Sequence, residues 1–164
     1  MPILTINNTQ EYLQAMTDMV KQACKTPIGR YYGMDDFILQ NGQAFQHAPL
    51  PEGIKRGKMK MCYQNAAILA LDNPKLIYCE GYAHSIIHTA HAFCVTEDGF
   101  VVDPTWKDGK DYYGVLFKTE FLRETILKRK YYGIIDDWQN HWPIFTTPKE
   151  QWHRPLLAAR LEAA

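Results

Sequence analysis

The sequence predicts an α+β fold in which a central helix that bears a cysteine packs on an antiparallel β-sheet. Two observations favour this class. A segment with helical periodicity comes first, and a run of short segments rich in Val, Phe, Tyr and Ile follows, separated by turn residues. Between them lies the apolar run CYQNAAILAL, residues 62–71. Strands joined by short turns pair as antiparallel neighbours. At 164 residues the chain fits a single domain, 1–164.

The N-terminal part predicts one helix followed by irregular chain. Residues 8–25 form an amphipathic pattern that Asn8 can cap, and Thr26-Pro27 ends it. Its apolar face gathers Tyr12, Leu13, Met16, Met19, Val20 and Ala23. From residue 28 to 61 glycines and prolines interrupt every period, so we expect a long irregular segment, which in compact domains is often functional.

The rest of the chain predicts a buried helix, a sheet and further helices. Residues 61–71 are good helix formers and apolar nearly all round, and Asp72-Asn73-Pro74 stops them. Strands are expected at 76–82, 89–96 and 100–104. After the amphipathic helices at 8–25 and 118–130, a third amphipathic helix is expected at 156–163. Residues 118–130 predict an amphipathic helix with its inward face formed by Phe121, Leu122, Ile126 and Leu127. Residues 138–152 receive no assignment.

Composition narrows the classes of partner. Eighteen basic and eighteen acidic residues cancel, which argues against a nucleic-acid partner and against an anionic membrane surface. The longest mostly apolar run, residues 62–71, is half of a membrane span. The four cysteines show no CxxC spacing, and the N-terminus has no signal-peptide pattern. We therefore expect a cytoplasmic protein with reduced thiols and no cofactor.

Cys62 is the candidate nucleophile. A reactive thiol needs a base, a positive local field and access, and Cys62 stands at the predicted start of a helix, where the dipole favours a thiolate. The densest basic cluster precedes it, formed by Lys55, Arg56, Lys58 and Lys60. This cluster suggests an anionic or carrier-linked substrate, although a solvated loop explains it as well. Three other thiols are expected to pack as small hydrophobic groups, namely Cys24, Cys79 and Cys94.

The turn after residue 96 decides whether a histidine can meet a carboxylate. With a two-residue turn, Asp103 lies on the face opposite His91. With a three-residue turn over residues 97–99, Thr96 pairs with Phe100, and His91 and Asp103 become diagonal neighbours on one face. Gly99 favours the second register, because that turn closes with a left-handed residue.

In this register Asp103 would orient His91 as the general base for Cys62. An oxyanion hole would need further donors. The backbone N–H of Cys62 is one candidate. Side-chain candidates are Gln43, Gln46 and Gln64, of which Gln46 is slightly preferred to Gln43.

Three sequence runs resemble the transglutaminase-like branch of the papain-like cysteine enzymes. These are CYQNAAILA, YCEGYA and HAFCVTEDGFVVDPTW, and the same block occurs in small uncharacterised bacterial and phage proteins. The resemblance covers about a third of the chain, from Met61 to about Phe117, within a core at about 58–118. It implies Cys62 as nucleophile, His91 as base and Asp103 as orienting carboxylate. Supporting positions would fall on Asn65, Tyr82 and Trp106.

The resulting expectation is a cysteine hydrolase or acyltransferase that acts on a peptide, amide or ester through a thioester. The chain shows no acidic loop of the kind that holds calcium. Two alternatives stay open. One is a zinc protein that uses His84, His88 and His91 with Cys79 or Cys94. The other is a non-catalytic binding module on the same fold.

Overall fold

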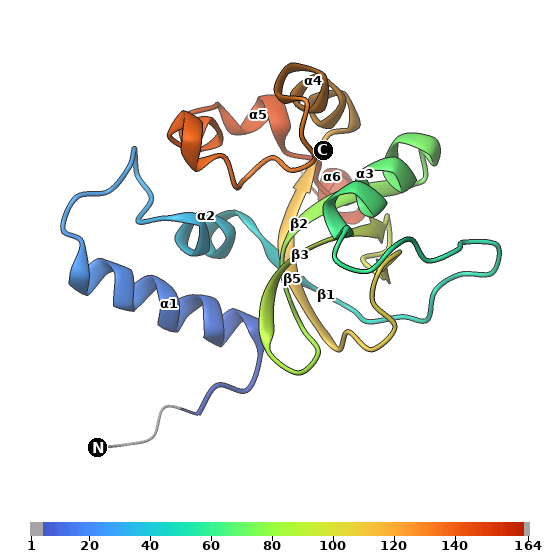
Figure 1. Cartoon of the computed structure of the whole chain (residues 1–164), viewed down its shortest axis with the longest axis horizontal. Coiled ribbons are helices and arrows are strands. Elements are labelled where there is room, and N and C mark those ends of the chain that lie inside the picture. Colours follow the sequence, from blue (N-terminus) through green and yellow to red (C-terminus); the bar gives the residue numbers. More distant parts are fainter. Residues whose placement is uncertain (1–4, 163–164) are drawn as a thin grey trace.

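The computed structural model describes residues 5–162 and has the expected α+β class (Figure 1). The helices are α1 (Thr9–Ala23), α2 (Met34–Asn41), α3 (Cys62–Asp72), α4 (Thr119–Arg129), α5 (Lys149–Trp152) and α6 (Leu157–Glu162), with 3-10 turns at Trp138–Asn140 and Pro143–Phe145. The strands are β1 (Gln43–Phe45), β2 (Leu76–His84), β3 (His88–Thr96), β4 (Val101–Val102) and β5 (Asp111–Phe117).

The strands form one antiparallel sheet in the order β1-β5-β2-β3-β4, and the sheet curls until its two edges meet. The backbone of Gln46, just after β1, accepts a hydrogen bond from Val101 N at 2.9 Å and donates one to Gly99 O at 3.1 Å. This closure leaves few unpaired edges. The enclosed core holds Phe45, Ile77, Cys79, Ala83, Phe93, Val95, Val101, Tyr112 and Leu116.

The helices cover the outer face of the curled sheet. In Figure 1, α1 and α2 lie on one side, α3 lies on the other, and α4 and α5 lie beyond one end of the strands. Helix α3 approaches β3 closely because three small side chains are fully buried between them, Ala66, Ala67 and Ala70. The thiol of Cys94 on β3 donates to Ala66 O at 3.2 Å. This contact holds the N-terminal half of α3 against the strand that carries His91.

Most of the predicted elements are confirmed. Asn8 caps α1 by accepting a hydrogen bond from Glu11 N at 2.8 Å. The predicted helix at 118–130 is α4, and the one at 156–163 is α6, although Ala163 lies outside the described residues. The expected strand at 100–104 is reduced to the two residues of β4.

Several expectations were wrong. The segment 28–61 is not wholly irregular, because it contains α2 and β1, and the segment 138–152 forms short helical turns. Strand β5 was not predicted as a strand, yet it is central to the sheet. Met19 is 60% and Leu127 61% exposed, although both were assigned to buried faces. Met19 is exposed because the C-terminal end of α1 extends away from the sheet (Figure 1).

The three-residue turn of the β3–β4 hairpin is confirmed. Cys94 pairs with Val102 and Val95 with Val101. Thr96 N donates to Phe100 O at 2.9 Å, and Gly99 N donates to Thr96 O at 2.9 Å. Gly99 has a φ of +84°, the left-handed conformation that closes such a turn. The register places Asp103 on the same face of the sheet as His91.

Replacing Gly99 with alanine is expected to destabilise the protein by about 1–2 kcal/mol. An added Cβ has room, since the nearest atom would be Leu156 Cδ1 at 3.6 Å, so the loss should come from the backbone alone. Urea unfolding measures it. Asp98→Ala in the same turn, where φ is not positive, is the control. Equal stability of the two variants would contradict the expectation.

Candidate active site

His91 and Asp103 form a buried pair. His91 lies on β3 and is 0% exposed, and Asp103, directly after β4, is 6% exposed. The Nε2 atom of His91 is 2.8 Å from Asp103 Oδ2. Because Nε2 is engaged by the carboxylate, Nδ1 is the ring nitrogen left to meet a third group.

Asp103 is held by three further donors. Its Oδ1 accepts from Thr105 N at 2.8 Å and from Trp106 N at 3.0 Å, and its Oδ2 accepts from the Tyr112 hydroxyl at 2.8 Å. Burial disfavours the charged carboxylate, but the hydrogen bond and charge of His91, together with the backbone donors, keep the pKa of Asp103 below its ordinary value. Asp103 is therefore an ionised and rigidly oriented carboxylate.

Cys62 is the first residue of α3 and is half-buried beside His91. Strand β4 ends at Val102, so the N-terminal half of β3 has no strand partner on that side. The N–H groups of Ala92 and Tyr63 lie toward the Cys62 sulfur. Nδ1 of His91 makes no hydrogen bond of good geometry, although Cys62 and His91 are close enough to shift each other's pKa. Loose contacts of this kind are common in sites without substrate.

The electrostatics favour an ion pair. Burial opposes a Cys62 thiolate, but the neighbouring His91 and the N–H groups of Ala92 and Tyr63 bring the pKa of Cys62 below its ordinary value. Burial also opposes a charged His91, yet the hydrogen bond to Asp103 and the neighbouring Cys62 raise its pKa to about 9. A lowered thiol pKa and a raised imidazole pKa together favour thiolate and imidazolium.

The remaining cysteines differ from Cys62. Cys79 and Cys94 are 0% exposed, and burial raises the pKa of both thiols, as expected for packing residues. Cys24 is exposed just after α1, so its assignment to the core was wrong. Of the four thiols, Cys62 alone has an imidazole beside it.

Two of the three supporting positions contact the site. The ring of Trp106 stacks on His91, with 4.0 Å between centroids and an interplanar angle of 20°. Asn65 donates from Nδ2 to Lys58 O and to Thr105 Oγ1, both at 2.9 Å, and so ties the loop before Cys62 to the segment after Asp103. By contrast, the Tyr82 hydroxyl is hydrogen-bonded to Asp35 and not to the Cys62, His91 or Asp103 side chains.

The glutamine candidates separate into two groups. Gln43 lies on β1 opposite Gly114, and Gln46 lies beside Phe100 at the turn end of the β3–β4 hairpin, four strand residues from Ala92. The pairings place both residues at the edge of the sheet formed by β1, away from the N-terminus of α3 in the chain, and the preference for Gln46 over Gln43 stays a prediction. Gln64 lies in the first turn of α3, next to the free N–H of Cys62. Sequence reasoning could not separate them without knowing β1.

Only one of the four basic candidates is directed toward the site. Lys55, Arg56, Lys58 and Lys60 are all exposed in the loop between β1 and α3. Arg56 donates from Nε to Trp106 O at 3.3 Å. Lys60 has a φ of +65°, an uncommon backbone conformation two residues before Cys62. The cluster is thus mostly a solvated loop, with Arg56 as its contact to the site.

Tyr112 is a residue that sequence reasoning missed. It lies on β5, 1% exposed, and donates to the same Asp103 oxygen that meets His91. Its only signal was the strand-like run DYYGVLF, which gives no hint of which tyrosine turns toward Asp103.

The variant Tyr112→Phe is expected to lose about 1 kcal/mol of stability and to slow the alkylation of Cys62 by iodoacetamide about tenfold, because Asp103 loses one of its donors. Urea unfolding and alkylation rates measure the two effects. Tyr113→Phe is the matched control, since its hydroxyl bonds Leu39 O and Gly42 O instead. An alkylation rate equal to that of the wild type would contradict a positioning role for Tyr112.

The histidines of the zinc alternative do not converge. The rings of His84 and His88 lie 4.5 Å apart, while His91 is engaged with Asp103. Among residues 5–162 no three His, Cys, Asp or Glu side chains gather as metal ligands.

Within the same part of the chain, no helix combines the length and apolar character of a membrane span.

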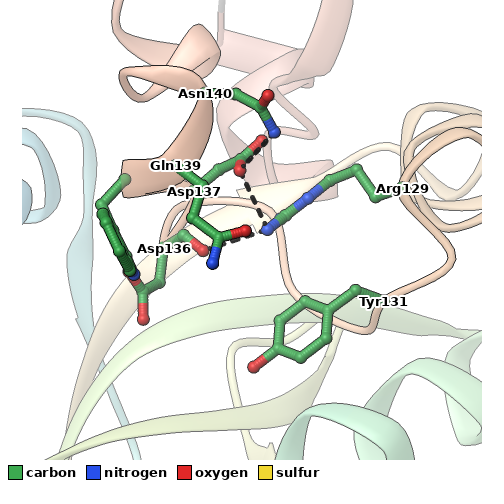
Figure 2. A pocket seen from close by; sticks show the side chains of 7 residues that line it. Arg129, Tyr131, Asp136, Asp137, Gln139 and Asn140 are labelled. Atoms are coloured by element: carbon green, nitrogen blue, oxygen red, sulfur yellow. Dashed lines mark hydrogen bonds and ion pairs between the residues drawn. The ribbon is translucent and has the colours of Figure 1, made fainter.

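Three cavities open on different elements of the described part of the chain. One of about 340 Å³ lies around Arg129, whose guanidinium pairs with Asp137 at 3.2 Å (Figure 2). Asp137 also accepts a hydrogen bond from Asn140 at 2.8 Å. The charge of Arg129 is therefore neutralised by an acid of the protein itself. A second cavity of about 640 Å³ adjoins it below α4. A third, of about 350 Å³, is lined by Asp103 and Trp106 and is the one of these that reaches the candidate site.

No protein-family model, no curated protein and no solved structure matches this chain. The interpretation of the site therefore depends on its own geometry and chemistry.

Proposed function

We propose that the protein is a cysteine-dependent hydrolase or acyltransferase that acts on an amide or ester bond. The observation that carries the proposal is the buried His91, which is held by Asp103 through Nε2 and lies beside Cys62. A carboxylate, an imidazole and a thiol in that order are the parts needed for nucleophilic acyl transfer.

In the first half-reaction the Cys62 thiolate attacks the carbonyl carbon of the substrate. The carbon–nitrogen or carbon–oxygen bond then breaks, and the imidazolium of His91 gives its Nδ1 proton to the leaving amine or alcohol. A thioester on Cys62 remains. In the second half-reaction water or an amine transfers a proton to Nδ1 as it attacks the thioester, and the Cys62 thiolate leaves.

The negative oxygen of each tetrahedral intermediate needs donors near Cys62. As the first residue of α3, Cys62 has a backbone N–H with no partner inside the helix, and the helix dipole adds a positive field there. Gln64 in the same first turn is the side-chain candidate. The pair would stabilise the oxyanion without any movement of the helix.

We further propose a papain-like, transglutaminase-like relationship for this arrangement. It is supported by a cysteine at the start of a helix, packed against an antiparallel sheet whose adjacent strands supply the histidine and the aspartate. A cytoplasmic location belongs to the same proposal, because a reducing compartment would keep Cys62 as a thiol.

Acetylation by p-nitrophenyl acetate tests the proposal without knowledge of the natural substrate. The ester should release p-nitrophenolate and leave one acetyl group on Cys62, which intact mass and peptide mapping would locate. Cys62→Ala should abolish this acetylation, whereas Cys24→Ala, the matched loss of an exposed thiol, should not. Folded protein that acquires no acetyl group on Cys62 would overturn the enzyme proposal. Added n-butylamine then separates amine transfer from hydrolysis by the product formed.

A further inference from the structure

The cavity of about 350 Å³ behind the His91–Asp103 pair has cationic side chains that no acid neutralises. Arg56 and Lys107 line it and are exposed. Among residues 5–162 neither makes an ion pair. This differs from the cavity of Figure 2, where Arg129 is paired with Asp137.

The one acid in the lining is Asp103, and it is already satisfied. Its two oxygens accept from His91, Thr105, Trp106 and Tyr112. Its charge is therefore balanced by the neighbouring imidazolium of His91. An anion in the cavity would meet Arg56 and Lys107, with little opposing charge from Asp103.

The remaining walls are aromatic and apolar. The rings of His47 and Tyr112 lie parallel, with centroids 6.3 Å apart, and Trp106 forms another wall. Residues 48–50 add an apolar edge. Flat aromatic surfaces below a pair of cations suit a ligand that has both an anionic group and an apolar or aromatic part.

We propose that this cavity binds a small organic anion, with the anionic group on Arg56 and Lys107 and the apolar part against Trp106 and the exposed ring of His47. The volume limits the ligand to the size of a substituted aromatic ring. Because Trp106 stacks on His91, the occupant would contact a residue that orients the imidazole without touching Cys62.

Calorimetric titration with phenyl phosphate tests the proposal, with phenol and inorganic phosphate as partial probes. Phenyl phosphate should bind about tenfold or more tightly than either, since only it combines both features. Arg56→Gln and Lys107→Gln should each weaken its binding about tenfold. Lys110→Gln, which removes an exposed lysine three residues from Lys107 and outside the cavity, should have no such effect.

Equal binding of phenol and phenyl phosphate would overturn the anionic part of the proposal, and equal binding of inorganic phosphate would overturn the aromatic part. An equal loss in Lys110→Gln would show general charge attraction and overturn the site. The titration is independent of the proposed enzyme activity. Cys62→Ala should retain binding because Cys62 does not line the cavity, so the two proposals fail separately.

Discussion

Replacing His91 with glutamine is expected to lower the rate at which iodoacetamide alkylates Cys62 at pH 7 by about a hundredfold. In the wild type, His91 keeps a proton and lowers the pKa of Cys62, so that more of the thiol is ionised at neutral pH than its ordinary pKa would allow. Without the imidazolium, burial would raise that pKa, and little thiolate would remain at pH 7.

The pH dependence distinguishes this mechanism from simple exposure. The rate profile of wild-type Cys62 should lie at lower pH than that of an ordinary thiol, while the His91→Gln profile should move to higher pH. Cys24 is exposed and provides an internal control in the same chain, because its rate should not change in the variant. If wild-type Cys62 reacts no faster than Cys24 at pH 7, the ion pair is refuted.

Replacing Asp103 with asparagine is expected to slow acetyl transfer from p-nitrophenyl acetate about 10³–10⁴-fold. The amide cannot stabilise the imidazolium, and it leaves the donors around Asp103 without a charged acceptor. Breaking one side of a buried pair should also cost about 3–5 kcal/mol of folding free energy. Acylation kinetics and urea unfolding measure the two losses, with Asp72→Asn at the exposed end of α3 as control.

The stability difference between wild type and Asp103→Asn should depend on pH with a defined sign. His91 has a pKa raised from 6.5 to about 9, so its contribution is complete below 6.5 and is lost as pH rises through about 9. Asp103 has a pKa below 3.8, so its contribution is present above 3.8 and is lost as pH falls through the lowered value. The difference should be largest near pH 5–6 and should shrink toward pH 9. A difference that does not change with pH would contradict the linkage.

The local chemistry of the hairpin was accessible from the sequence. Gly99 favoured a three-residue turn because only that turn needs a left-handed third residue, and the alternation of strand side chains then carried Asp103 to the face of His91. The start of α3 at Cys62 was also predictable, since an apolar helix-forming run follows it directly. These features depend on neighbours close in the chain.

The rest depended on contacts between distant segments. Strand β1 is three residues long with two of them exposed, so its pairing with β5 has no periodic signal and was not predicted. The Tyr112 hydroxyl reaches Asp103 only because the curled sheet brings β5 across from β4.

The sequence by itself determined the candidate nucleophile, the turn and the face shared by His91 and Asp103, because local backbone preferences decide these. The tertiary structure alone decided which tyrosine supports Asp103 and which cations line the cavity beside it. Sheet closure and loop packing join residues far apart in the chain, and no local preference encodes those distances.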